Sequence, residues 1–398
     1  MSMGADNAGF ESLQPYPFEK LRQLLEGVTP STPDPIPLSI GEPRHEPPAF
    51  VLDAYRDALA EGVSRYPTIQ GSEALRDACR AWLARRFGVR VDDDMVQPVN
   101  GTREALFAVA QAFIRSGSGQ KVLMPNPFYQ IYEGAALMAG AEPHYLNVSS
   151  EDDFLPDLEA INAETLAATR IFYLCSPVNP CGTIASLAYL QRLVELAIRY
   201  DFIVVADECY IELYRGTAPV SILNAASALS LPRPCANVLA FHSLSKRSNL
   251  PGLRSGFVAG DADLIARYRA YRTYHGCSMS LAVQKASIAA WSDDTHVAAN
   301  RALYDQKFTD AGRILATALA IEIPPAAFYL WPNIGGDDVA FCRDLFAHTH
   351  VTAVPGSYLS REVDGVNPGS GYVRLSLVAE PHATRTALER IAAFIKGD

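Results

Sequence analysis

Between residues 96 and 258 the chain alternates short apolar runs with amphipathic stretches, and this alternation limits the fold more than any other feature. Two stretches with helical periodicity, at residues 103–114 and 187–200, separate apolar runs that we expect to form strands at residues 121–124, 171–175, 203–206, 238–241 and 256–259. Strands that alternate with helices favour a mostly parallel sheet with helices on both faces. The predicted fold class is therefore α/β.

The pattern differs on either side of this region. Residues 11–48 are rich in proline, which is typical of an arm that lies across another surface. After about residue 285 a long helical stretch, short strands and two more helices follow. With 398 residues the chain exceeds the usual size of one domain. We predict an arm at residues 1–48 that joins a smaller α+β domain at 286–398, and a large domain at 49–285.

Composition narrows the classes of function. The formal charge of −10, from 34 basic and 44 acidic residues, argues against nucleic-acid binding. The sequence has no apolar run of the roughly 18 residues that span a membrane, and residues 1–11 do not resemble a signal peptide, so we expect a cytoplasmic protein without membrane contact. The seven cysteines include no Cys-x-x-Cys pair, so we expect neither a disulfide framework nor a metal site.

The segment at residues 241–257 reads Phe-His-Ser-Leu-Ser-Lys-Arg-Ser-Asn-Leu-Pro-Gly-Leu-Arg-Ser-Gly-Phe and directly follows a predicted strand. Ser243, Ser245 and Arg254 are suited to hold a phosphate. Lys246 then remains to form an imine with an aldehyde. The alternative is a solvated loop lysine flanked by turn serines.

Other polar residues also follow predicted strands, where ligands bind in sheets of this kind. Gly101 and Thr102 open a helix whose free N–H groups favour an anion, although a plain helix cap would look the same. Asp207 ends an apolar run, where it could bind a metal, cap a helix or pair with a heterocyclic cation. Tyr210 is placed to point into the same cleft, and Asn179 lies in a turn between two prolines.

Each of these residues is a weak signal alone, but their order and spacing together form a specific motif. Asn179 is followed by Asp207 after 28 residues and by Ser243 after another 36, with Lys246 and Arg254 behind it. In this order the chain resembles the fold-type I pyridoxal-phosphate aminotransferases, from Leu-Ser-Ile-Gly-Glu-Pro at residues 38–43 to Arg-Leu-Ser-Leu at 374–377. Cys181 departs from the family pattern, which usually has threonine there. We expect this change to affect packing and not chemistry.

The resemblance implies pyridoxal 5'-phosphate as cofactor and a role for each matching residue. Lys246 would form the imine, Asp207 would pair with the pyridine nitrogen, and Asn179 and Tyr210 would donate to the ring hydroxyl. Tyr129 resembles the aromatic residue that stacks on the ring. The phosphate site would consist of Gly101, Thr102, Ser243, Ser245 and Arg254, together with Tyr66 from the partner subunit of a homodimer.

The resemblance also assigns the substrate side. Arg374 matches the arginine for the α-carboxylate, and Gly41 lies in a matching substrate segment. From its position one residue after Thr102, we expect Arg103 to bind a distal carboxylate; the alternative is an exposed arginine in the first turn of a helix. A carboxylate clamp favours transamination over decarboxylation.

Within the family, Gln-Pro-Tyr-Pro-Phe-Glu-Lys-Leu at residues 14–21 resembles bacterial N-succinyldiaminopimelate aminotransferases of lysine biosynthesis. This implies transfer of an amino group from glutamate to N-succinyl-2-amino-6-oxopimelate. Two alternatives remain open: another pyridoxal-phosphate enzyme of this fold, such as an aspartate, aromatic or alanine aminotransferase or a carbon–sulfur lyase, and a non-catalytic effector-binding module.

Overall fold

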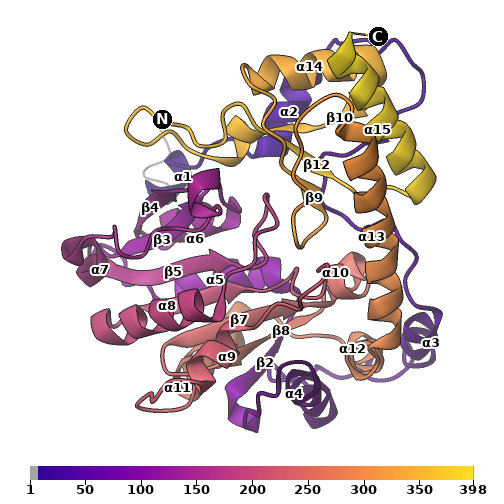
Figure 1. Ribbon diagram of the computed structural model, residues 1–398. Helices are drawn as coiled ribbons and strands as arrows, with labels where there is room; N and C mark the ends of the chain where they lie inside the picture. Colours follow the sequence, from indigo (N-terminus) through magenta and orange to yellow (C-terminus); the bar gives the residue numbers. More distant parts are fainter. Residues whose placement is uncertain (1–7, 398) are drawn as a thin grey trace, which may run out of the picture.

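The computed structural model describes residues 8–397, so the first seven residues of the predicted arm lie outside the described part. Within it, seven strands form a sheet in the order β2-β8-β7-β6-β5-β3-β4 (Figure 1). They are β2 (Val96–Val99), β3 (Lys121–Asn126), β4 (Glu142–Asn147), β5 (Thr169–Cys175), β6 (Ile203–Asp207), β7 (Val238–Ser243) and β8 (Gly256–Gly260). Only β8 runs against its neighbours. The prediction of a mostly parallel α/β sheet is confirmed.

The strands of this sheet are apolar on both faces, and each face carries its own core. Along β5, Phe172 and Leu174 pack into one core, whereas Ile171 and Tyr173 pack into the other. The helices over the first face are α4 (Glu73–Phe87), α8 (Leu187–Tyr200), α9 (Ile222–Ser227) and α12 (Leu281–Ser292). Over the second face lie α5 (Thr102–Phe113), α6 (Ile131–Met138) and α11 (Ala262–His275). Alternation within each strand thus directs side chains to two helical layers.

The predicted strand and helix positions agree with the structure to within a few residues. Residues 187–200 form a helix with the predicted bounds because Ser186 caps its start, accepting a hydrogen bond from the Tyr189 N–H, and Asp201 ends it in a left-handed conformation. The two edge strands of the sheet, β2 and β4, were not among the predicted strands. Strand β2 has only four residues and includes Gln97 and Pro98. Strand β4 pairs only with β3 and is mostly half-buried, so its sequence lacks an apolar run.

A smaller part of the chain packs above the carboxyl ends of the parallel strands. Its three-stranded antiparallel sheet consists of β9 (Tyr329–Leu330), β11 (Val354–Pro355) and β12 (Val373–Ser376). Helices α14 (Asp338–Thr349) and α15 (Pro381–Lys396) pack with it, and the long helix α13 (Thr295–Leu315) runs between the two parts (Figure 1).

The N-terminal segment crosses from one part to the other. Helix α1 (Ala8–Glu11) contacts α6, whereas α2 (Pro17–Leu25) packs on the smaller part. Strand β1 (Ile36–Pro37) pairs with β10 (Val351–Thr352). Three short helices complete the larger part: α3 (Ala49–Asp57), α7 (Ala163–Ala168) and α10 (Leu244–Arg247). Among the described helices, none is both long and apolar enough to cross a membrane.

Candidate active site

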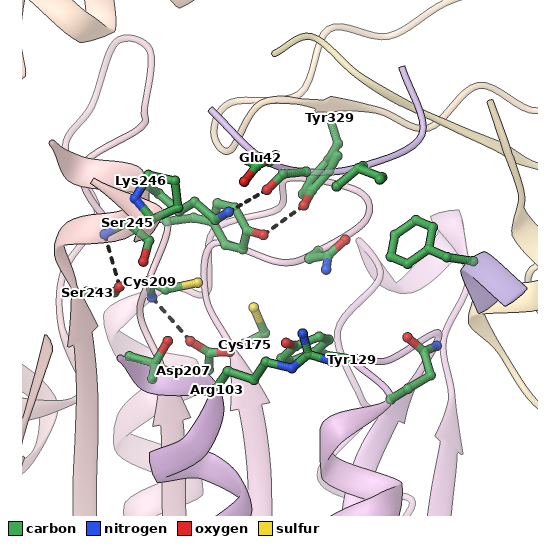
Figure 2. A pocket seen from close by; sticks show the side chains of 18 of the residues that line it. Glu42, Arg103, Tyr129, Cys175, Asp207, Cys209, Ser243, Ser245, Lys246 and Tyr329 are labelled. Atoms are coloured by element: carbon green, nitrogen blue, oxygen red, sulfur yellow. Dashed lines mark hydrogen bonds between the residues drawn. The ribbon is translucent and has the colours of Figure 1, made fainter. Parts of the chain in front are cut away.

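A cavity of about 470 Å³ opens between the carboxyl ends of the parallel strands and the smaller part. Twelve of the fourteen residues predicted for the site line it: Gly41, Thr102, Arg103, Tyr129, Asn179, Asp207, Tyr210, Ser243, Ser245, Lys246, Arg254 and Arg374. Figure 2 shows Lys246, Asp207 and Tyr129 around this cavity. The residues converge because each parallel strand ends at the same edge of the sheet.

Lys246 enters the cavity from the short helix α10, which directly follows β7. Ser243 caps this helix, since its Oγ accepts a hydrogen bond of 3.1 Å from the Ser245 N–H. The Lys246 ammonium donates a hydrogen bond to the Gly41 carbonyl oxygen. Burial lowers the pKa of Lys246 to about 8. An amine with this pKa exchanges a proton readily near neutral pH.

Asp207 ends β6 with a side chain that is almost completely buried. The Tyr132 hydroxyl donates to its Oδ2 over 2.8 Å, and the Cys209 N–H donates to Oδ1 over 3.3 Å. Burial raises the pKa of Asp207, and these two donors oppose the rise. Among the described residues Asp207 has no ion-pair partner, and a buried carboxylate of this kind is costly, so the site is suited to a cationic group placed against Asp207.

Tyr132 was not predicted from the sequence. It lies three residues after Tyr129, in the first turn of α6, and this spacing alone does not point to Asp207. Its ring stacks on Tyr173 at 4.5 Å between centroids, inside the core. Tyr132 therefore donates a hydrogen bond to Asp207 from the core, whereas Tyr129 lines the cavity.

An anion site forms where α5 begins. Gly101 has a φ of +84°, and a Cβ atom there would lie 2.2 Å from the Arg254 Nη2. The guanidinium of Arg254 therefore reaches the first turn of α5, which presents free N–H groups. Ser243 and Ser245 line the same cavity. Gly101 itself does not line the cavity, but it lies next to Arg254 at this site.

Arg374 lies on β12 with 4% of its surface exposed. Its Nη1 donates to Asn179 Oδ1 over 3.0 Å, and its Nη2 donates to the Ser39 carbonyl oxygen over 2.8 Å. Its Nε is buried and has no hydrogen-bond partner among the described residues. The Tyr329 ring lies 4.6 Å from the guanidinium carbon. Arg374 lines the cavity with a buried guanidinium, a planar donor group that suits a carboxylate ligand.

The cavity lining also includes two aromatic residues from the N-terminal segment, Tyr16 and Phe18, that the sequence did not indicate as site residues. The Tyr16 ring lies 5.5 Å from the Arg103 guanidinium carbon, and the Phe18 ring lies 5.9 Å from that of Arg374. Tyr66 is the predicted site residue that remains apart. It is fully exposed and does not line this cavity.

Comparisons with known proteins agree with this geometry. The family Aminotransferase class I and II matches residues 33–391. LL-diaminopimelate aminotransferase from Nitratidesulfovibrio vulgaris is 31% identical over 389 residues, covering 96% of this chain and 97% of that protein. The enzyme of the same name from Dehalococcoides mccartyi is 29% identical and covers 96% and 97%.

Two solved structures show the same fold. An aminotransferase from Neisseria meningitidis has a TM-score of 0.93 and 42% identity, covering 98% of this chain and 100% of that chain. The aminotransferase AspB from Helicobacter pylori has a TM-score of 0.90 and 37% identity, covering 97% and 100%. The chain therefore belongs to the class I and II aminotransferases, which use pyridoxal 5'-phosphate to transfer amino groups.

Proposed function

We propose that this enzyme transfers an amino group from glutamate to N-succinyl-2-amino-6-oxopimelate, a step of lysine biosynthesis. The observation that carries this proposal is a pair of arginines in one cavity. Arg374 is buried beside Asn179, and Arg103 lines the cavity from the first turn of α5. Both substrates have a carboxylate on the reacting carbon and a second carboxylate at a distance.

The residues present fit pyridoxal 5'-phosphate. The phosphate would bind at Gly101, Thr102, Ser243, Ser245 and Arg254, where Gly101 adopts a φ of +84° that favours glycine and Arg254 approaches it closely. The buried carboxylate of Asp207 suits the pyridine nitrogen, and Tyr129 offers an aromatic face. When bound, the cofactor supplies an electron sink for the bond between Cα and its hydrogen.

The chain's own residues would orient the substrate and move the proton. Asp207 keeps a positive charge favourable at the ring nitrogen. Asn179 and Tyr210, which line the cavity, would donate to the ring hydroxyl. Arg374 would grip the α-carboxylate and so align the Cα–H bond. Lys246 would then act as the base that takes the proton from Cα and as the acid that delivers it to the aldehyde-derived carbon of the cofactor, a role that its lowered pKa favours.

The names of the curated relatives support a second candidate, LL-diaminopimelate. Its distal end carries an ammonium beside a carboxylate, whereas the distal groups of the succinylated compound are all neutral or anionic. Arg103 favours an anionic end. Glu42, which also lines the cavity, is the residue that an ammonium would use.

Single-turnover spectroscopy of the holoenzyme separates the two candidates. We expect N-succinyl-LL-2,6-diaminopimelate and glutamate to react with kcat/KM at least ~10-fold above that of LL-2,6-diaminopimelate. The distal ammonium of the free diamine would be repelled by Arg103 and so offset a charge-assisted contact worth about 1.5–3 kcal/mol. A preference for the free diamine would overturn the succinylated assignment and support the second candidate. If neither compound reacts, the assignment of this enzyme to lysine biosynthesis is wrong.

We also propose a homodimer in which Tyr66 serves the partner's site. The support is its complete exposure in a loop beside other exposed apolar side chains, including Leu59 and Val63. Tyr66→Phe should weaken cofactor retention during dialysis. An unchanged release rate in a dimeric variant would contradict this role.

A further inference from the structure

Asn300, on α13, lies at the centre of a buried hydrogen-bond network behind the cavity. Its Oδ1 accepts from Asn249 Nδ2 over 3.1 Å and lies 2.8 Å from His45 Nδ1. Its Nδ2 donates to the Lys246 carbonyl oxygen over 3.3 Å. His45 follows Gly41 by four residues, and Asn249 precedes Arg254 by five. One amide thus joins the three segments that carry Gly41, Lys246 and Arg254.

Lys307 extends the network to the smaller part. Its side chain is on α13 and only 1% exposed. Its Nζ lies 2.6 Å from His45 Nε2 and donates to the Leu377 carbonyl oxygen over 3.1 Å. Leu377 directly follows β12, the strand that bears Arg374. The network therefore connects the segment of the predicted amine with the segment of the predicted carboxylate clamp.

The charge of Lys307 fixes the direction of every bond in this network. An ammonium only donates, so His45 Nε2 must accept and the ring proton must be on Nδ1, which donates to Asn300 Oδ1. The Asn300 amide group then faces the Lys246 carbonyl as a donor. Burial lowers the pKa of Lys307 to about 8, and Glu380 opposes this; burial and Lys307 lower the pKa of His45. At neutral pH the lysine is thus mostly charged and the histidine neutral.

We propose that Lys307, His45 and Asn300 are positioning residues that fix Lys246 relative to Arg374, with the Lys307 ammonium setting the direction of the hydrogen bonds. This inference rests on the roles proposed for Lys246 and Arg374. Without the ammonium, the His45 ring can carry its proton on Nε2, so that Nδ1 becomes an acceptor. The Asn300 amide then has to rotate so that its NH2 group donates to Nδ1. Its oxygen would then face the Lys246 carbonyl oxygen, and the hydrogen bond to Lys246 would be lost.

The first test is Lys307→Met, which keeps the length of the side chain and removes its charge. A misplacement of ~1 Å costs up to ~100-fold in rate, so we expect kcat to fall ~10- to 100-fold. The Kd of glutarate, a dicarboxylate that cannot react, should stay within ~3-fold, since both arginines remain. Equal losses in kcat and glutarate affinity would overturn the positioning role.

The second test is a double-mutant cycle with His45→Asn. The amide of asparagine can take the place of the ring Nδ1 and donate to Asn300 without help from Lys307. We therefore expect the double variant to recover to within ~3-fold of His45→Asn. Losses that multiply would show that the two residues act independently and would overturn the network.

A third readout does not depend on turnover. Competitive acetylation of the apoenzyme, followed by peptide mass spectrometry, measures the reactivity of Lys246. We expect Lys307→Met to change it at least ~3-fold and the control Lys285→Met, on the exposed side of α12, to leave it unchanged. An unchanged rate in Lys307→Met refutes the inference. If Lys307→Met does not fold, Asn300→Asp, which keeps the acceptor and loses the donor to Lys246, decides by the same measurement.

The two proposals fail separately. Activity retained in Lys246→Ala would remove the role of the amine, and with it the proposed function. A normal Lys246 acetylation rate in Lys307→Met would remove only the positioning network.

Discussion

Replacing Arg103 with methionine tests how the enzyme recognises the distal end of its substrates. The guanidinium lies in the first turn of α5, lines the cavity and stacks on Tyr16 at 5.5 Å. A cation at a helix N-terminus is unfavourable by about 0.3–1 kcal/mol, so its removal should not unfold the protein. A charge-assisted contact to the distal carboxylate contributes about 1.5–3 kcal/mol. This corresponds to roughly 10- to 150-fold in kcat/KM.

The assay is kcat/KM for glutamate and for alanine, which has no distal carboxylate. We expect Arg103→Met to lower the value for glutamate by roughly 10- to 150-fold and to change that for alanine less than ~3-fold. Arg199→Met is a matched control, since Arg199 also stacks on a tyrosine, Tyr200 at 5.4 Å, and does not line the cavity. If both amino donors lose activity equally, Arg103 does not bind the distal carboxylate.

Three further predictions follow from the buried charges. Because the lowered pKa of Lys246 is about 8, its acetylation in the apoenzyme should rise with pH and level off above pH 8, as the neutral amine becomes dominant; a rise that continues to pH 10 would contradict this. Asp207→Ala should retain the cofactor through the phosphate site but lose several orders of magnitude in rate, and near-normal single-turnover kinetics would exclude its role. Glu133→Gln should lower the free energy of unfolding by about 1.5–3 kcal/mol, because it removes the negative charge that the half-buried Arg361 contacts at 2.6 Å. Glu159→Gln, at an exposed ion pair, should cost less than about 1 kcal/mol in the same denaturation experiment.

Strand positions and the edge that carries the site could be predicted because both follow from local patterns. A buried parallel strand needs an apolar run, and its carboxyl end is the residue where that run stops. Asp207 and Lys246 were found in this way, at the ends of β6 and β7. The edge strand β4 was not predicted because it has a neighbouring strand on one side only, and an edge strand tolerates polar residues.

The sequence by itself determined the α/β fold, the family and the set of polar residues at the strand ends, since each depends on the order and spacing of residues along the chain. The tertiary structure alone decided which distant side chains meet. Arg374 reaches Asn179 across 195 residues, and Lys307 reaches His45 across 262. Helical and strand periodicity indicate which face of an element is buried, but the partner on that face depends on how the elements pack. For this reason Tyr132, Tyr16 and the network around Asn300 became visible only in the folded chain.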